Sequence, residues 1–156
     1  MKACVQTVIG LSVLIMLVSC ASSYETKGNR AYTAAKKASG DEERRLYKTA
    51  YIMYKRALEA RPSRASRKLK ERFIEMTIMR ARLVLTEANS EMEAIPLYME
   101  DIDSVMAKTS DINDELKREY ANFLVLLADS ILVNGKLTDA LDLIDKAADV
   151  AANPDR

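Results

Sequence analysis

Residues 121–152 read ANFLVLLADSILVNGKLTDALDLIDKAADVAA, and this stretch decides the fold class. Its apolar residues recur at helical spacing on both sides of the pair Asn134-Gly135. An Asn-Gly pair is a typical helix end, because glycine readily adopts the left-handed conformation that follows the last turn. The stretch therefore predicts two antiparallel helices with a short turn between them, over residues 110–133 and 137–152.

The rest of the chain has the same helical character. Its 156 residues include only 4 Gly and 3 Pro, while strong helix formers abound. No run of alternating β-branched residues indicates a strand. Four further helices are expected over residues 27–38, 41–60, 63–88 and 90–108. The sequence thus predicts an all-α domain of about six helices, paired as antiparallel hairpins.

Several residues mark where these helices should begin or end. Asp41 is the expected N-cap of the second helix, and Ser90 opens a capping box for the fourth. Pro62 should follow the end of the second helix. Pro96 lies inside the fourth and should either kink it or delay its start.

Small and large apolar residues follow a spacing that resembles the tetratricopeptide repeat, which uses small residues where two helices touch and large ones to fill the gaps. In the last hairpin the matching residues are Leu124, Leu127, Ala128, Ile131, Ala140, Ile144 and Ala147. The first hairpin matches at Ala50, Tyr54, Ala57 and Pro62, and the middle one at Ala94 and Tyr98, with Asp101 in place of its last small residue. The resemblance implies three hairpins stacked as a short α-solenoid over residues 27–154, with a concave face that binds a peptide or partner helix.

An ordinary helical bundle, or another α-solenoid, is the alternative. Alanine is common in this chain and can fall at these spacings by chance. The intervals from Ala50 to Ala94 and from Ala94 to Ala140 are 44 and 46 residues, whereas the family's period is about 34. The hairpins are therefore longer than standard, or divergent.

The N-terminus has the features of an export signal. Lys2 precedes a largely apolar stretch over residues 5–18, which is shorter than the roughly 20 residues of a membrane-spanning helix. It ends in Leu17-Val18-Ser19-Cys20, which resembles the bacterial lipobox. The resemblance implies a signal peptide over residues 1–19, lipid attachment at Cys20 and cleavage before it. A plain transmembrane anchor or a buried apolar helix is the alternative.

The expected signal peptide and lipid attachment at Cys20 set the expected localisation. Two or three acyl chains on Cys20 would anchor the protein stably, because each buried methylene contributes about 0.8 kcal/mol. Ala21 follows the cysteine, and the absence of Asp there resembles lipoproteins of the outer membrane that face the periplasm. Residues 20–26 are expected to form a lipidated tether that spans only about 23–25 Å when extended. The helical domain should therefore lie close to its membrane.

Charge is distributed unevenly along the chain. Residues 25–83 carry 17 Lys/Arg against 7 Asp/Glu, and residues 84–156 carry 6 against 16. One hypothesis is that the basic half, next to the lipid, faces anionic headgroups while the acidic half faces a partner. A solvated surface and head-to-tail self-association are the other two interpretations. A nucleic acid is not an expected partner of an exported protein.

The sequence lacks the motifs of catalytic and metal sites. There is no His, no phosphate-binding glycine loop and no pair of cysteines at metal-ligand spacing. Asp101, Asp103 and the run over residues 111–115 offer carboxylates without the glycine and distal Glu of a calcium loop, and helix capping explains the run better. We therefore expect no enzyme activity, no metal, no cofactor and no site residue other than Cys20.

Aromatic and sulfur-containing side chains are expected in the core. The tyrosines concerned are Tyr51, Tyr54 and Tyr98, and the methionines are Met76, Met79, Met92, Met99 and Met106. The alternative is that some of these methionines line an adaptable groove.

The leading functional hypothesis is a scaffold that holds or assembles another envelope protein. The alternative is a lipoprotein that carries a small or hydrophobic ligand to a transporter, which would need an enclosed apolar pocket. A third possibility is a structural subunit of a repeating assembly.

Overall fold

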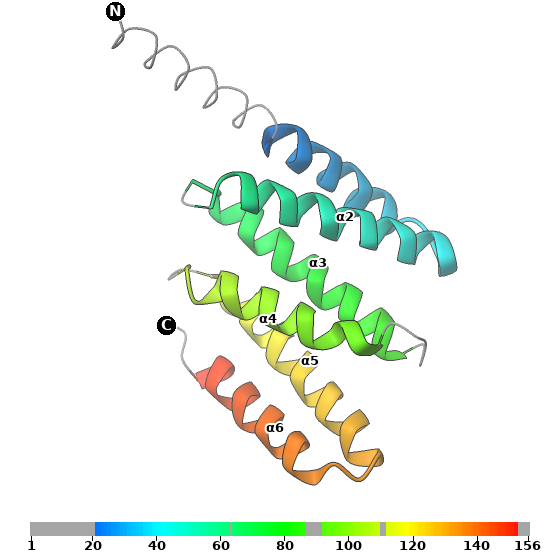
Figure 1. The fold of residues 1–156 in the computed structure, drawn as a ribbon, viewed down its shortest axis with the longest axis vertical. Helices are drawn as coiled ribbons and strands as arrows, with labels where there is room; N and C mark the ends of the chain where they lie inside the picture. Colours follow the sequence, from blue (N-terminus) through cyan, green and yellow to red (C-terminus); the bar gives the residue numbers. More distant parts are fainter. Residues whose placement is uncertain (1–20, 63, 87–91, 110–111, 153–156) are drawn as a thin grey trace, which may run out of the picture. The chain divides into compact units, whose positions relative to one another are not determined.

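The computed structural model describes residues 21–62, 64–86, 92–109 and 112–152, and every regular element in these ranges is helical. The elements are a helix over residues 21–35, α2 (Gly40–Ala60), α3 (Arg67–Thr86), the short 3-10 helix η1 (Met92–Ala94), α4 (Ile95–Met106), α5 (Asp114–Val133) and α6 (Leu137–Ala152) (Figure 1). The predicted all-α class with about six helices is confirmed. Within these ranges, none of the helices has both the length and the apolar composition needed to cross a membrane.

The chain divides after Lys70 into two compact units. We call the described residues 21–70 unit 1 and the described residues from Glu71 to Ala152 unit 2. The division falls within α3, so that only the first turn of this helix belongs to unit 1.

Unit 1 is built on a close contact between its first helix and α2. The Tyr54 hydroxyl donates a hydrogen bond to Asn29 Oδ1 at 2.9 Å, and Tyr54 is fully buried. Gly28 permits this approach, because a Cβ at that position would lie 2.8 Å from the Tyr54 ring. Ala50 and Ala57 are also fully buried on the same helix as Tyr54. Small residues thus bring the two helices together.

The first helix begins earlier than the sequence predicts. Residues 21–26, expected in the tether, are helical, and Thr26 Oγ1 donates to the Ser22 carbonyl one turn before it. The segment contains no Gly or Pro to interrupt a helix, and Ala21 is buried. At about 1.5 Å per residue these six residues rise about 9 Å, far less than an extended chain would span.

The turn before α2 also differs in detail from the prediction. Ser39 is the N-cap, in extended conformation, and Gly40 follows with φ of +62°. Asp41, predicted as the N-cap, lies instead in the first helical turn, where it pairs with Arg44. The left-handed backbone at Gly40 sets the cap two residues earlier.

Helix α3 begins later than the predicted residue 63. A turn closes between the Arg64 amide and the Arg61 carbonyl, and the Ser66 hydroxyl then accepts a hydrogen bond from the Leu69 amide. Ser66 therefore caps a helix that starts at Arg67. The predicted residues 63 and 87–91, with the capping box at Ser90, lie outside the described residues.

Pro96 delays a helix rather than kinking one. Helix α4 starts at Ile95 with Pro96 in its first turn, directly after η1. A proline is tolerated there because the first-turn amides have no partner within the helix. In α5 the N-cap is Asn113, whose side chain accepts from the Glu115 amide at 2.9 Å. The predicted start at residues 110–111 lies outside the described residues, and the expectation that this run caps a helix is confirmed at Asn113.

The α5–α6 hairpin has the predicted form. Gly135 adopts the left-handed conformation, with φ of +77°, and its amide donates to the Leu132 carbonyl at 2.9 Å. The Lys136 amide donates to the Ile131 carbonyl. This pair of bonds terminates α5 and reverses the chain. Helix α6 covers the predicted residues 137–152.

Most of the residues predicted to pack in the hairpins are buried. Those buried in α5 and α6 are Leu124, Leu127, Ala128, Ala140 and Ala147. Ile131 is half-buried, and Ile144 is 44 % exposed on α6. The half-buried Leu143 lines the open groove described below. Ala94 is half-buried in η1 and Tyr98 is buried in α4.

Candidate binding groove

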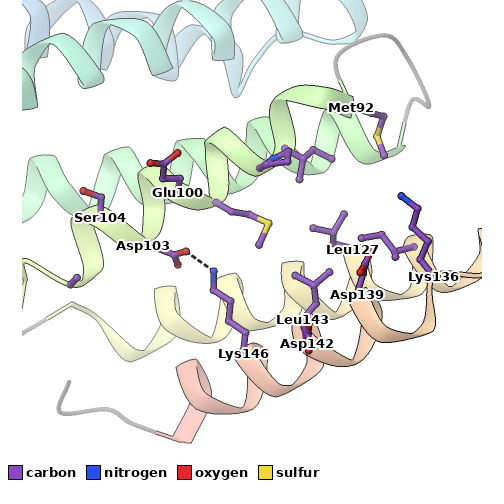
Figure 2. Close-up of a pocket in the computed structure, with 15 residues that line it drawn as sticks. Met92, Glu100, Asp103, Ser104, Leu127, Lys136, Asp139, Asp142, Leu143 and Lys146 are labelled. Atoms are coloured by element: carbon purple, nitrogen blue, oxygen red, sulfur yellow. Dashed lines mark hydrogen bonds and ion pairs between the residues drawn. The ribbon is translucent and has the colours of Figure 1, made fainter.

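A groove of about 1040 Å³ runs along unit 2 between α4 and α6, with α5 beneath it (Figure 2). It is largely open to solvent. Three sets of residues line it. From η1, α4 and the turn after α4 come Met92, Ile95, Pro96, Met99, Glu100, Asp103, Ser104 and Ala107. From α5 come Leu127 and Ile131, and from α6 and the residue before it come Lys136, Asp139, Asp142, Leu143 and Lys146.

The two walls of the groove run in the same chain direction. Met92 and Lys136, which precede α4 and α6, lie at one end in Figure 2, and Asp103 and Lys146 lie toward the other. This follows from the order of the helices, because two successive reversals along α4, α5 and α6 make the outer two parallel. The groove therefore runs between two parallel helices.

The floor of the groove is apolar. Leu127 is buried, and Met99, Ile131 and Leu143 are half-buried around it. Leu127 and Leu143 point into the groove in Figure 2. Methionine is unbranched and flexible, so Met99 can adapt its shape to a ligand.

The rim of the groove is acidic. Glu100 on the α4 wall and Asp139 and Asp142 on the α6 wall are exposed. Within the described part of the chain, Lys136 at the end of the groove and Lys146 are the basic residues of the lining. Lys146 is already paired with Asp103. The rim therefore carries an excess of negative charge.

A polar network bridges the two walls near one end of the groove. Asp103 on α4 accepts a hydrogen bond from the buried Tyr120 hydroxyl at 2.9 Å and pairs with Lys146 Nζ at 2.5 Å. Lys146 Nζ also lies 5.7 Å from the centre of the Tyr120 ring. One carboxylate thus joins α4, α5 and α6 and helps to set the spacing of the two walls.

The environment of Tyr120 holds its hydroxyl in the protonated form. Burial raises the pKa of the phenol well above its ordinary value of 10.0, and the negative charge of Asp103 and the hydrogen bond to it raise it further. The hydroxyl therefore remains a hydrogen-bond donor throughout the neutral range.

A second buried polar pair lies beneath α4. Arg80 of α3 is 2 % exposed, and its Nε donates to the Tyr98 hydroxyl at 3.2 Å. A buried charge is costly unless it is hydrogen-bonded, so this contact helps to fix α4 on α3. The α4 wall is thereby held in place from below.

Unit 1 carries a smaller hollow, of about 530 Å³, on its first helix. Its lining consists of polar and basic side chains with one alanine: Thr26, Asn29, Arg30, Thr33, Ala34 and Lys37. It lacks the apolar floor of the α4–α6 groove.

The structure tests some of the residues that the sequence analysis singled out and leaves others undescribed. Cys20 and the rest of the lipobox lie outside the described residues. Asp103 belongs to the network with Tyr120 and Lys146, and among the described residues no cluster of His, Cys, Asp or Glu could hold a metal ion.

Of the five methionines expected in the core, Met76 is fully buried and Met79 and Met106 are half-buried, whereas Met92 and Met99 line the groove. Tyr54 and Tyr98 are buried as predicted, while Tyr51 is half-buried.

Sequence reasoning did not find the groove. Its two walls come from different predicted hairpins, so no local pattern links Glu100 to Asp142. The hydrogen bond between Tyr120 and Asp103 was not predicted either. One sequence signal could have indicated a groove: Met92 and Met99 lie in the predicted fourth helix, and the predicted sixth helix is acidic.

Comparisons with known proteins add no relatives. Scans against protein-family models, curated proteins and solved structures each found no match to this chain.

Proposed function

We propose that this chain is a lipid-anchored scaffold of the bacterial cell envelope, and that it holds a partner protein in the α4–α6 groove. Lipidation at Cys20 would attach it to the outer membrane facing the periplasm. The helical hairpins would act as a tetratricopeptide-like domain, although the groove lies between the second helices of two hairpins.

The groove is the observation that carries this proposal. It combines an apolar floor around Leu127 with a charged rim, as protein interfaces combine an apolar centre with a polar border. It is largely open to solvent rather than enclosed. An open channel suits a segment of another protein, which enters from the side.

The charge distribution supports an orientation at the membrane. Unit 1 carries 14 Lys/Arg against 5 Asp/Glu, and residues 71–156 carry 9 against 18. Because Cys20 immediately precedes unit 1, the basic unit would face anionic headgroups. The acidic groove of unit 2 would then remain available to a partner.

The test is capture of the partner from crosslinked membranes. The tagged, lipidated protein, a Cys20→Ala variant and a Leu143→Ala variant are compared by mass spectrometry. We expect one envelope complex to be enriched by the wild type, lost with Cys20→Ala and reduced with Leu143→Ala. A partner retained equally by Leu143→Ala would refute the groove as the binding surface, and no enriched partner would refute the scaffold.

A small-molecule carrier is the second candidate. The groove volume of about 1040 Å³ is at the upper end of the range for ligand pockets, and its floor is apolar. Native mass spectrometry of the protein purified from its membrane tests this function. A bound hydrophobic compound displaced by Leu143→Ala would favour the carrier over the scaffold.

A further inference from the structure

We infer that the α4–α6 groove binds a short amphipathic helix of the partner, with apolar residues along one face and Lys or Arg on both sides of that face. This inference rests on the proposed function and specifies the chemistry of the partner. Three properties of the groove support it: its length, its floor and its rim.

The length of the groove matches a short helix. The Asp103–Lys146 pair bridges the two walls, so the unobstructed α4 wall runs over the eight residues 95–102 and is about 12 Å long. A helical segment of about eight residues, or two turns, has the same length. It would place two or three side chains on the floor at intervals of three and four residues.

The floor selects apolar side chains. Leu127 is 4 % exposed at its base, with Met99 and Leu143 beside it. A leucine or similar residue that entered the groove would exclude water from these three side chains. Such burial is the main favourable term in helix-in-groove recognition.

The rim selects basic side chains on both sides of the apolar face. Glu100 lies on the outer edge of the α4 wall, with its carboxylate directed away from α6 in Figure 2, and Asp139 and Asp142 lie on the α6 wall. Asp103 is paired with Lys146, so the three exposed carboxylates outnumber the one remaining basic residue of the lining, Lys136. A helix seated between the walls would place Lys or Arg near both. The same field disfavours an acidic helix, including α6 of a second copy, which carries Asp139, Asp142, Asp145 and Asp149.

The probe is a synthetic alanine-based helix of about 16 residues, long enough to be partly helical in isolation. It has a leucine stripe on one face and lysines on both sides of it. One control peptide has the same composition with its leucines dispersed around the helix, and another has Glu in place of Lys. Binding to the full lipidated protein in neutral phosphatidylcholine nanodiscs is measured by fluorescence anisotropy.

Two matched pairs of protein variants locate the binding site. Asp139→Asn with Asp142→Asn removes two rim charges, while Asp145→Asn with Asp149→Asn removes two charges elsewhere on the same helix. Leu143→Ala shortens a floor residue, while Leu141→Ala shortens an exposed leucine outside the groove. Circular dichroism verifies that each variant retains its helices.

We expect the basic amphipathic peptide to bind and both control peptides to bind at least about tenfold more weakly. The rim double variant should weaken binding about three- to tenfold, because each exposed charge pair contributes modestly. Its control pair should change binding less than about twofold. Leu143→Ala should likewise weaken binding more than Leu141→Ala.

Failure of this inference can be separated from failure of the proposed function. Equal binding of all three peptides, equal effects of the two double variants, or no peptide binding would overturn the inference. If the membrane capture still yields a partner that depends on Leu143, the scaffold function stands and only the partner's chemistry is wrong. If neither experiment yields Leu143-dependent binding, both proposals fail.

Discussion

Units 1 and 2 differ in which helices meet and how closely. In unit 1, Gly28 and buried alanines let two consecutive helices, the first helix and α2, approach until the Tyr54 ring touches the opposite backbone. In unit 2, α4 and α6 belong to different hairpins with α5 between them in the chain, and a groove lined by Met99 and Leu143 remains between them. Consecutive helices with small residues at their contact close on each other, whereas two parallel helices joined through a third leave room for a groove.

The two units also differ in charge. Unit 1 carries a formal charge of +9, and residues 71–156 carry −9. The basic unit has tight packing and a polar hollow, whereas the acidic unit has the apolar groove. Five predictions test this contrast, ordered from the largest expected effect to the smallest.

The core of unit 2 should be the most sensitive to truncation. Phe123→Ala removes a fully buried ring from α5 and should lower the free energy of unfolding by about 3–5 kcal/mol. Urea denaturation measures this loss, and hydrogen exchange should rise more in α5 and α6 than in the helix over residues 21–35. Val125→Ala, at an exposed position of α5, is the control. A loss below about 1 kcal/mol for Phe123→Ala would show that the ring is not essential to the core.

The network at the end of the groove should depend more on Asp103 than on Lys146. Asp103→Ala leaves the buried Tyr120 hydroxyl without its acceptor, which should lower the free energy of unfolding by about 1–3 kcal/mol. Lys146→Met removes only a partly exposed ion pair and should cost less than about 1 kcal/mol. Thermal denaturation of both variants gives the comparison, and equal losses would contradict the assigned role of Tyr120.

The close contact between Gly28 and Tyr54 in unit 1 should be disrupted by an added methyl group. Gly28→Ala places a Cβ against the Tyr54 ring and should destabilise the protein by about 1–2 kcal/mol, even though alanine favours helices. Combining it with Tyr54→Leu should recover part of the loss in a double-mutant cycle. Lys27→Ala, at the exposed neighbouring position, is the control. Stabilisation by Gly28→Ala would show that the helices lie further apart.

Unit 1 should bind anionic membranes and unit 2 should not. A lipid-free form of residues 21–156 should bind vesicles that contain phosphatidylglycerol, and Lys37→Gln should weaken binding by about 1 kcal/mol, or about fivefold. Lys136→Gln, in unit 2, should have little effect. Co-sedimentation at low and high ionic strength measures both. Absence of binding at low salt would refute membrane docking through unit 1.

The smallest effect is expected at alkaline pH. Because burial raises the pKa of Tyr120 above its ordinary value of 10.0, folding retains a proton that the unfolded chain releases. The resulting stability is present below about pH 10 and should be lost as the pH rises above it toward the folded-state pKa. Tyr120→Phe should flatten this part of the stability profile, measured by urea denaturation at several pH values. An unchanged alkaline slope would contradict the role of Tyr120.

The sequence predicted the helices better than their ends. Gly135 ends a helix and Pro96 begins one close to the predicted positions, because the backbone preferences of these two residues act locally. The starts of α2 and α3 differed from prediction. A left-handed glycine, Gly40, follows the N-cap of α2, and α3 begins only after a turn at Arg61–Arg64, with Ser66 as its cap. The propensities of single residues do not fix these turns.

The candidate site was less predictable than the fold. The sequence suggested methionines in the core, or some in a groove, and the structure places Met92 and Met99 along the groove. Ile144 was predicted to pack inside, yet Leu143 of the same helix faces the groove and Ile144 is exposed. On a helix a rotation of one residue, about 100°, exchanges an inward side chain for an outward one. The spacing of apolar residues on α6 allows either face.

The sequence by itself determined the all-α class, the six helices, the α5–α6 turn and the opposite charges of the two halves. These properties follow from residue type and from spacing within single helices. Only the tertiary structure decided the groove, the Tyr120–Asp103–Lys146 network and the contact of Gly28 with Tyr54. Each of these joins residues from different helices, and their juxtaposition depends on how closely the helices pack.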